Sequence, residues 1–266
     1  MTGVQTCALP ISTVSLNNWL LYRPVSYYDF PQNYGNLISL DGVQNKAVLV
    51  RFENKSLLYN NLLTIDTSNP QAAYVGNNKL FSSAPPIDYA ETDLGYVGTQ
   101  NKFLLKIPQG QITTDAKRGQ IFLLQGSNAV DLTGPGSGVT RFMTDHLNFE
   151  ILDYFPAVPV DNAFNGIGMC GVYDSKYDRV IITKLDYVPT EQYIGEMTYN
   201  PVDGKFYVND VAVELTNPNY FCNRSFTISF SFVTKSWLSF HSYLAHYYIG
   251  DNNFFYSGNK IGRAHV

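Results

Sequence analysis

One adjacent pair of residues, Asp145 and His146, has the side-chain types that enzymes use for proton transfer. A general base of this kind acts on a nucleophile within hydrogen-bond reach, usually a serine or a second titrating group. The sequence supplies no partner serine and no second histidine near the pair. We therefore interpret Asp145 and His146 as a surface pair and not as half of a catalytic dyad.

Metal ligation needs side chains that face one point. His241 and His246 are an odd number of positions apart, so on a strand they would lie on opposite faces. A zinc site needs four correctly spaced ligands, whereas Cys170 and Cys222 stand 52 positions apart without a C-x-x-C pattern. The two cysteines are predicted to be free, buried thiols in preference to a disulfide.

Asp174, Asp178 and Asp186 are spaced loosely for a calcium loop, which alternates oxygen ligands tightly. Lys176 lies between the first two aspartates, and a hydrogen-bonded β-turn fits this pattern better.

The glycine-rich segment 134–138 resembles a phosphate-binding loop only superficially. It lacks the Gly-Lys-Ser/Thr ending, and Ser137 is not flanked by glycines in the manner of a nucleophile elbow. We interpret it as a plain loop. The sequence thus predicts no catalytic, cofactor-binding or metal-binding residues and no cofactor.

The composition excludes several classes of protein. The chain has 266 residues, of which 45% are hydrophobic and 15% charged, and 18 basic against 22 acidic side chains give a net charge of −4. Disordered chains are less hydrophobic and more highly charged, and strongly basic nucleic-acid binders have the opposite balance. No run approaches the about 18 apolar residues of a membrane-spanning helix, so no membrane span is expected.

The two ends read as nucleic-acid adapter and not as protein. Residues 1–11 back-translate to a common sequencing adapter, and residues 261–266 back-translate to its complementary strand. We expect both segments to be artefacts and the chain to be a fragment of a longer reading frame. Without Arg263 the body 12–260 has 17 basic and 22 acidic residues, a net charge of −5.

The body shows a recurring hairpin pattern. Short runs of β-branched and aromatic residues flank polar turns at 46–59, 102–124, 167–183 and 226–240. Each turn carries a lysine, and Lys55, Lys117, Lys176 and Lys235 are separated by 62, 59 and 59 positions. Such a period indicates a repeat architecture, with the lysines at solvent-exposed tips.

Additional strands are predicted at 193–200, 205–209 and 211–215, around a turn at 201–204. Several short strands per unit are typical of a propeller blade. The predicted fold class is all-β, a partial β-propeller of about four repeated antiparallel hairpin blades over 12–260. A β-sandwich of unrelated hairpins is the alternative. We expect a loop at 128–140 and a short surface helix at 138–147 between blades.

The aromatic stretch 237–248 could form a sugar platform or a base-stacking surface. Packing between twisted sheets is the favoured interpretation. No sialidase-type aspartate box (Ser-x-Asp-x-Gly-x-Thr-Trp) occurs, which counts against a sugar-cleaving propeller.

Two segments carry a family resemblance. Residues 221–244, FCNRSFTISFSFVTKSWLSFHSYL, and 168–184, GMCGVYDSKYDRVIITK, resemble successive blades of virion structural proteins of crAss-like gut phages. These are stabilisation, or tail nozzle, proteins of short-tailed bacteriophages. The resemblance implies a β-propeller in a homo-oligomeric ring on the tail, which retains packaged DNA and later releases it. It carries over no catalytic residues.

The resemblance implies a non-catalytic virion component, assembled in the bacterial cytoplasm beside other tail or portal-proximal proteins. DNA would pass through without sequence-specific binding, which a net negative charge suits because gripping phosphates requires clustered Lys and Arg. The alternative is a receptor- or glycan-binding propeller on a virion or bacterial surface. An open ring would expose unpaired strand edges, so a fragment is expected to fold poorly alone.

Overall fold

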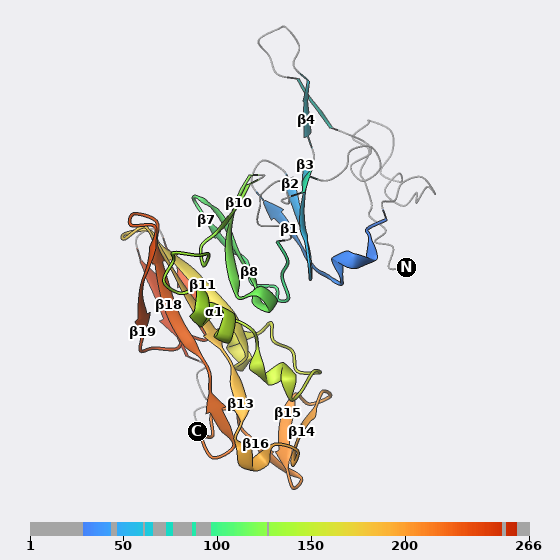
Figure 1. Cartoon of the computed structure of the whole chain (residues 1–266), viewed down its shortest axis with the longest axis vertical. Coiled ribbons are helices and arrows are strands. Elements are labelled where there is room, and N and C mark those ends of the chain that lie inside the picture. Colours follow the sequence, from blue (N-terminus) through green and yellow to red (C-terminus); the bar gives the residue numbers. More distant parts are fainter. Residues whose placement is uncertain are drawn as a thin grey trace. The chain divides into compact units, whose positions relative to one another are not determined.

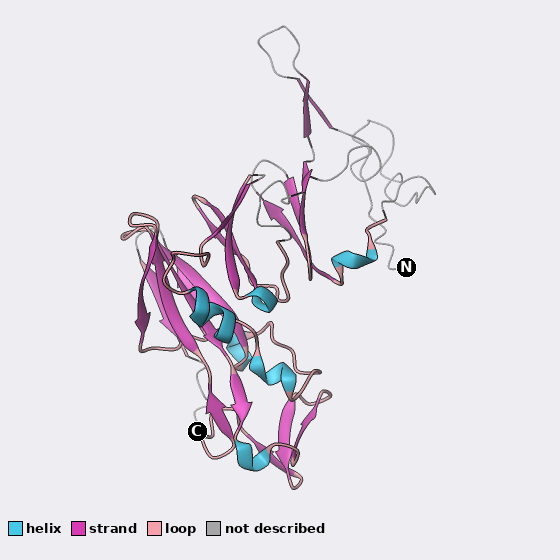
Figure 2. Cartoon of the chain, in the orientation of Figure 1, coloured by secondary structure: helices cyan, strands magenta, loops and turns pink. Residues whose placement is uncertain are grey.

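The computed structural model describes residues 29–43, 47–60, 62–65, 73–76, 87–88, 97–126, 128–251 and 254–259. These residues are predominantly β, with one short α-helix, which confirms the predicted all-β class (Figure 2). The predicted adapter segments 1–11 and 261–266 lie outside the described residues.

The strands and helices, many of which are labelled in Figure 1, follow the chain in this order. The strands are β1 (Leu37–Val43), β2 (Ala47–Phe52), β3 (Ser56–Asn60), β4 (Leu62–Ile65), β5 (Ala73–Gly76), β6 (Ile87–Asp88), β7 (Leu105–Ile107), β8 (Gly110–Asp115), β9 (Gln120–Gln125), β10 (Asn128–Asp131), β11 (Gly168–Asp174), β12 (Arg179–Leu185), β13 (Tyr187–Pro189), β14 (Met197–Asn200), β15 (Lys205–Val208), β16 (Val211–Val213), β17 (Phe221–Asn223), β18 (Phe226–Ser231), β19 (Ser236–His241), β20 (Tyr247–Gly250) and β21 (Phe255–Gly258). The α-helix is α1 (Thr140–His146), and short 3-10 helices occur at Gln32–Tyr34, Ala116–Arg118, Glu150–Asp153, Ala163–Asn165 and Glu191–Tyr193.

The chain divides into two compact units. One comprises Met1–Gln100 with Gln125–Ala129, and the other comprises Asn101–Leu124 with Val130–Val266. The first unit contains the antiparallel sheet β1-β2-β3-β6 and the pair β4-β5. Its core consists of Val50, Phe52, Leu57 and Tyr59, which alternate on β2 and β3 as a strand with one buried face requires.

The hairpin predicted at 46–59 is present as β2 and β3. The turn lysine was predicted to lie at a solvent-exposed tip, but Lys55 is only 7% exposed. The Lys55 ammonium lies 5.0 Å from the centre of the Tyr34 ring, a cation–π contact that draws the side chain inward.

The sheet β10-β9-β8-β7 corrects the second predicted hairpin. The strand that leads into the turn at 115–119 is β8, which the sequence analysis missed, and the predicted strand at 102–107 shrinks to β7. The predicted loop at 128–140 begins with a strand, β10. Every residue of β8 is buried although four of the six are Gln, Thr or Asp, which explains why its pattern looked like a loop.

The third and fourth predicted hairpins, β11–β12 and β18–β19, are both present. They do not form separate blades, because β12 pairs with β18 and all four strands make one sheet, β11-β12-β18-β19. The intervening chain leaves this sheet to form the pair β13-β17 and the three-stranded sheet β14-β15-β16. The predicted turn at 201–204 connects β14 to β15.

Three of the hairpins share one loop geometry. In each, four residues separate the last paired positions, which are Asp115 and Gln120, Asp174 and Arg179, and Ser231 and Ser236. The fourth loop residue is left-handed in every case, with φ of 66° at Gly119, 44° at Asp178 and 51° at Lys235. The exposed lysines do not share one position in this loop, because Lys117 and Lys176 are its second residue and Lys235 is its fourth, so their equal spacing does not follow from the loop.

Each of the three four-stranded sheets runs antiparallel and follows chain order from one edge to the other. This meander is the strand order of a propeller blade. The described residues do not form a closed ring of blades.

In the second unit, the sheet β7–β10 packs on the sheet β11-β12-β18-β19 with corresponding strands together. Near β7 and β11, a Cβ built on Gly171 would lie 3.2 Å from the Phe103 ring, so only glycine permits this approach without adjustment of the ring. Near β10 and β19, the Trp237 indole N–H donates to the Leu132 carbonyl at 2.8 Å. The first strands of the two sheets, β7 and β11, therefore lie together, and so do their last strands, β10 and β19.

Trp237→Phe is expected to lower the free energy of unfolding by about 1–2 kcal/mol, because the Leu132 carbonyl loses its donor. Packing against Phe230, with ring centres 5.3 Å apart, is retained by phenylalanine. Denaturant unfolding followed by near-UV circular dichroism measures this loss. Tyr256→Phe, at a side chain 62% exposed, is the control and should change little. Equal effects would contradict the proposed bridge between the sheets.

The predicted short surface helix is present as α1, and Thr140, Arg141, Thr144 and Asp145 on it are exposed. Its inward face is apolar, because Met143 and the following residue, Leu147, are fully buried and belong to the main hydrophobic core. That core also includes Ile112 and Ile121 of one sheet and Ile182 of the other, so α1 closes the same apolar interior that the sheets share.

Candidate functional site

A buried pair of opposite charges, Lys184 and Asp186, is the most concentrated polar feature of the second unit. Lys184 lies on the face of β12 that also carries Val180 and Ile182, four and two residues earlier, so the strand period places its side chain in the core. Asp186 follows the end of the same strand. Both side chains are 0% exposed.

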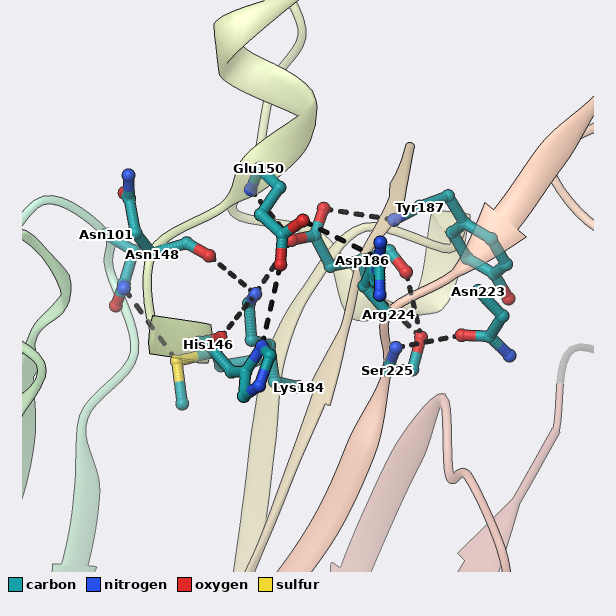
Figure 3. Close-up of polar contacts among 11 residues, drawn as sticks. Asn101, His146, Asn148, Glu150, Lys184, Asp186, Tyr187, Asn223, Arg224 and Ser225 are labelled. Atoms are coloured by element: carbon teal, nitrogen blue, oxygen red, sulfur yellow. Dashed lines mark hydrogen bonds and ion pairs between the residues drawn. The ribbon is translucent and has the colours of Figure 1, made fainter. Parts of the chain in front are cut away.

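All the hydrogen-bonding capacity of Lys184 is used (Figure 3). Its Nζ donates to the His146 carbonyl at 2.8 Å, to the Asn148 carbonyl at 2.6 Å and to Asp186 Oδ2 at 2.7 Å. An ammonium has three donors, so none is left for a ligand. The Phe149 ring centre lies 5.0 Å from Nζ and closes the remaining side.

The carboxylate and the backbone of Asp186 are also fully hydrogen-bonded. Its Oδ2 also accepts the Glu150 backbone N–H at 2.9 Å, and its Oδ1 accepts the Tyr187 backbone N–H at 3.0 Å. Its own backbone N–H donates to Ser225 Oγ at 3.0 Å, and its carbonyl accepts the Arg224 backbone N–H at 2.9 Å. The pair thus ties the segment 146–150 to both β12 and the start of β18 (Figure 3).

A second layer of charges surrounds the pair at the surface. Glu150 lies 3.6 Å from Arg224 Nε and 3.7 Å from His146 Nδ1. These contacts are partly exposed and long, so they contribute little individually.

Burial governs the protonation of the pair. Desolvation lowers the pKa of Lys184, and the negative charge of Asp186 raises it in part. Desolvation likewise raises the pKa of Asp186, and the hydrogen bond and positive charge of Lys184 oppose this. Removing two ions from water costs more than their attraction returns, and such a pair is tolerable only when every bond is satisfied. Its chemistry is therefore that of a structural tie.

No protein-family model matches the chain, and no curated protein matches it either. Among the described residues, no helix is long and apolar enough to cross a membrane.

The structure separates the aspartates considered for calcium. Asp174 accepts from Arg179 Nε at 2.8 Å, and Asp178 accepts from Tyr173 and Gln109, each at 2.7 Å. Within the described part of the chain, no group of three or more His, Cys, Asp or Glu side chains could hold a metal ion. Asp178 and its donors form the hydrogen-bonded turn that the sequence indicated.

The side chains of Asp145 and His146 point to different partners. Asp145 lies 3.8 Å from Arg141 at the surface, whereas the His146 side chain points to Glu150. The significant atom of His146 is its backbone carbonyl, which sequence analysis could not single out.

Thr140 holds the glycine-rich loop 134–138 in place. Its hydroxyl shares one proton between the Thr133 carbonyl, at 2.7 Å, and the Gly134 carbonyl, at 2.9 Å.

Both cysteines are free, as predicted, but only one is covered. Cys222 is exposed, which corrects the prediction that it is buried. Cys170 donates to the Ala245 carbonyl at 3.3 Å, and burial raises the pKa of its thiol to about 12. A thiol of that kind is unreactive at neutral pH.

The aromatic stretch 237–248 is divided between packing and exposure. Trp237 is partly buried against the core. Phe240 contacts Phe142, with ring centres 4.8 Å apart, yet remains 54% exposed. The predicted packing role therefore fits Trp237 better than Phe240.

Proposed function

We propose that the protein is a non-catalytic structural component of a bacteriophage tail, of the nozzle or stabilisation type that helps retain and release packaged DNA. The observation that carries the proposal is the placement of the segments with the family resemblance. Residues 168–184 supply β11 and most of β12, and residues 221–244 supply β17, β18 and β19. Apart from β17, which pairs with β13, these strands build one blade-like sheet and not two successive blades.

The stacking of sheets supports a propeller as the finer fold. Four-stranded meanders whose first strands face each other, as β7 and β11 do, are how neighbouring blades pack. β20 continues this stack, because its Gly250 lies against Val172 of β11. A Cβ added to Gly250 would lie 3.5 Å from a methyl group of Val172. The hairpin β20–β21 thus has the position of the first half of another blade.

The chemistry of the interior supports a scaffold and not an enzyme. The buried pair Lys184 and Asp186 is saturated by hydrogen bonds to the backbone and to each other. A net charge of −4 also suits a surface past which DNA must move without being held.

The oligomeric state tests the proposal. Analytical ultracentrifugation and negative-stain electron microscopy of the purified protein are expected to show a closed ring of defined stoichiometry. A glycan array run on the same sample is expected to show no binding. A strictly monomeric protein that binds glycans would overturn the tail assignment and favour the receptor-binding alternative.

A further inference from the structure

The hairpin β20–β21 and the connection 242–246 that leads to it lie on the second face of the sheet β11-β12-β18-β19. Polar bonds fasten them there. The Tyr248 hydroxyl pairs with Thr183 Oγ1 at 2.6 Å, and Thr227 Oγ1 donates to the Tyr243 carbonyl at 2.7 Å. Cys170 donates to the carbonyl of Ala245, which is 1% exposed.

A histidine stands at each end of this connection, and each has one ring nitrogen buried without a partner. The atoms are His241 Nε2, at the end of β19, and His246 Nδ1, just before β20. The backbone N–H of His246 is bonded, since it donates to the Gly258 carbonyl at 2.9 Å, so only the ring is unpaired at that nitrogen. A neutral ring tolerates such a site, whereas an imidazolium must place a charged donor there.

The surrounding charges offer the imidazolium no compensation. Arg179 on β12 repels a positive charge on His241, and its own partner is Asp174. The other titratable groups around the connection are Cys170 on β11, Tyr243, which stacks on His241 with ring centres 5.5 Å apart, and Tyr248 on β20. Burial first, and Arg179 second, lower the pKa of His241 below its ordinary value.

We propose that the connection 241–246 is an acid-sensitive clasp, in which protonation of His241 releases the hairpin β20–β21 from the sheet. The attachment is at full strength above the ordinary histidine pKa of about 6.5 and weakens as the pH falls below it. The sign follows from geometry, because the released connection gives the His241 ring to water and takes up a proton that the attached form resists.

Hydrogen–deuterium exchange between pH 7.5 and 5.5, corrected for intrinsic rates, tests this in the intact protein. Carboxylates titrate mainly below this range. Local opening at β20 is expected to increase by up to about tenfold per pH unit as His241 protonates on release. Opening at β18 should stay unchanged.

His241→Gln removes the titration and should make β20 exchange independent of pH. His241→Phe repeats the test with a ring of similar shape. His146→Gln is the matched control, since that side chain is 39% exposed, and it should keep the wild-type pH dependence. A pH dependence that persists in both folded His241 variants, or that extends equally to β18, would overturn the clasp.

Discussion

Lys184→Met is expected to lower the free energy of unfolding by about 3–5 kcal/mol, the usual effect of removing one member of a buried ion pair. The change leaves the Asp186 carboxylate in the core, 0% exposed, without its cation. It also leaves the His146 and Asn148 carbonyls without the donor that both now share. Urea unfolding monitored by circular dichroism, with attention to the transition of the second unit, measures the loss.

Two further variants separate the pair from a general loss of charge. Lys184→Met combined with Asp186→Leu removes both ions, so it should be less destabilising than the two single variants added together. Arg141→Met breaks an exposed pair, with Arg141 96% exposed, and should cost less than about 0.5 kcal/mol. If Lys184→Met cost no more than Arg141→Met, the tie would have no stabilising role.

The local structure of the hairpins could be predicted because each strand is specified by residues next to one another. β12 and β18 are rich in Val, Ile, Phe and Thr and adjoin polar turns, so their pattern is complete within a few positions. β8 was missed for the same reason. Its sequence GQITTD is polar, and its burial comes from elements that pack on it and not from its own composition.

Pairing between distant strands could not be predicted in the same way. The regular lysine spacing indicated a repeat, but nothing local shows that β12 pairs with β18 across the excursion that contains β13 to β17. The three hairpin loops share a backbone conformation and not a sequence, since Gly119, Asp178 and Lys235 occupy the same left-handed position.

The buried tie was hidden because its acceptors are main-chain carbonyls, which every residue has. His146 and Asn148 lie 38 and 36 positions before Lys184. The sequence held one signal for the tie. Lys184 follows Val180 and Ile182 at the strand period, so it lies on an apolar strand face, and Asp186, two positions later, offers it a partner.

Gly119→Ala is expected to lower the free energy of unfolding by about 2–5 kcal/mol, through two separable terms. The left-handed φ of 66° costs an L-residue about 1–2 kcal/mol. A Cβ at this position would also lie 2.4 Å from the Thr144 Cα, so helix α1 must shift, and overpacking of this kind costs about 1–3 kcal/mol more. Denaturant unfolding gives the sum of the two terms.

Gly204→Ala isolates the first term. Gly204 has nearly the same φ, 68°, but its Cβ would meet only the Tyr199 hydroxyl, 4.0 Å away. It should therefore cost about 1–2 kcal/mol, and the difference between the variants is the contact with α1. Asp178 and Lys235 show that the fold accepts side chains at the equivalent loop position where no helix approaches. Equal losses in the two variants would mean that α1 yields freely, which its fully buried Met143 and Leu147 argue against.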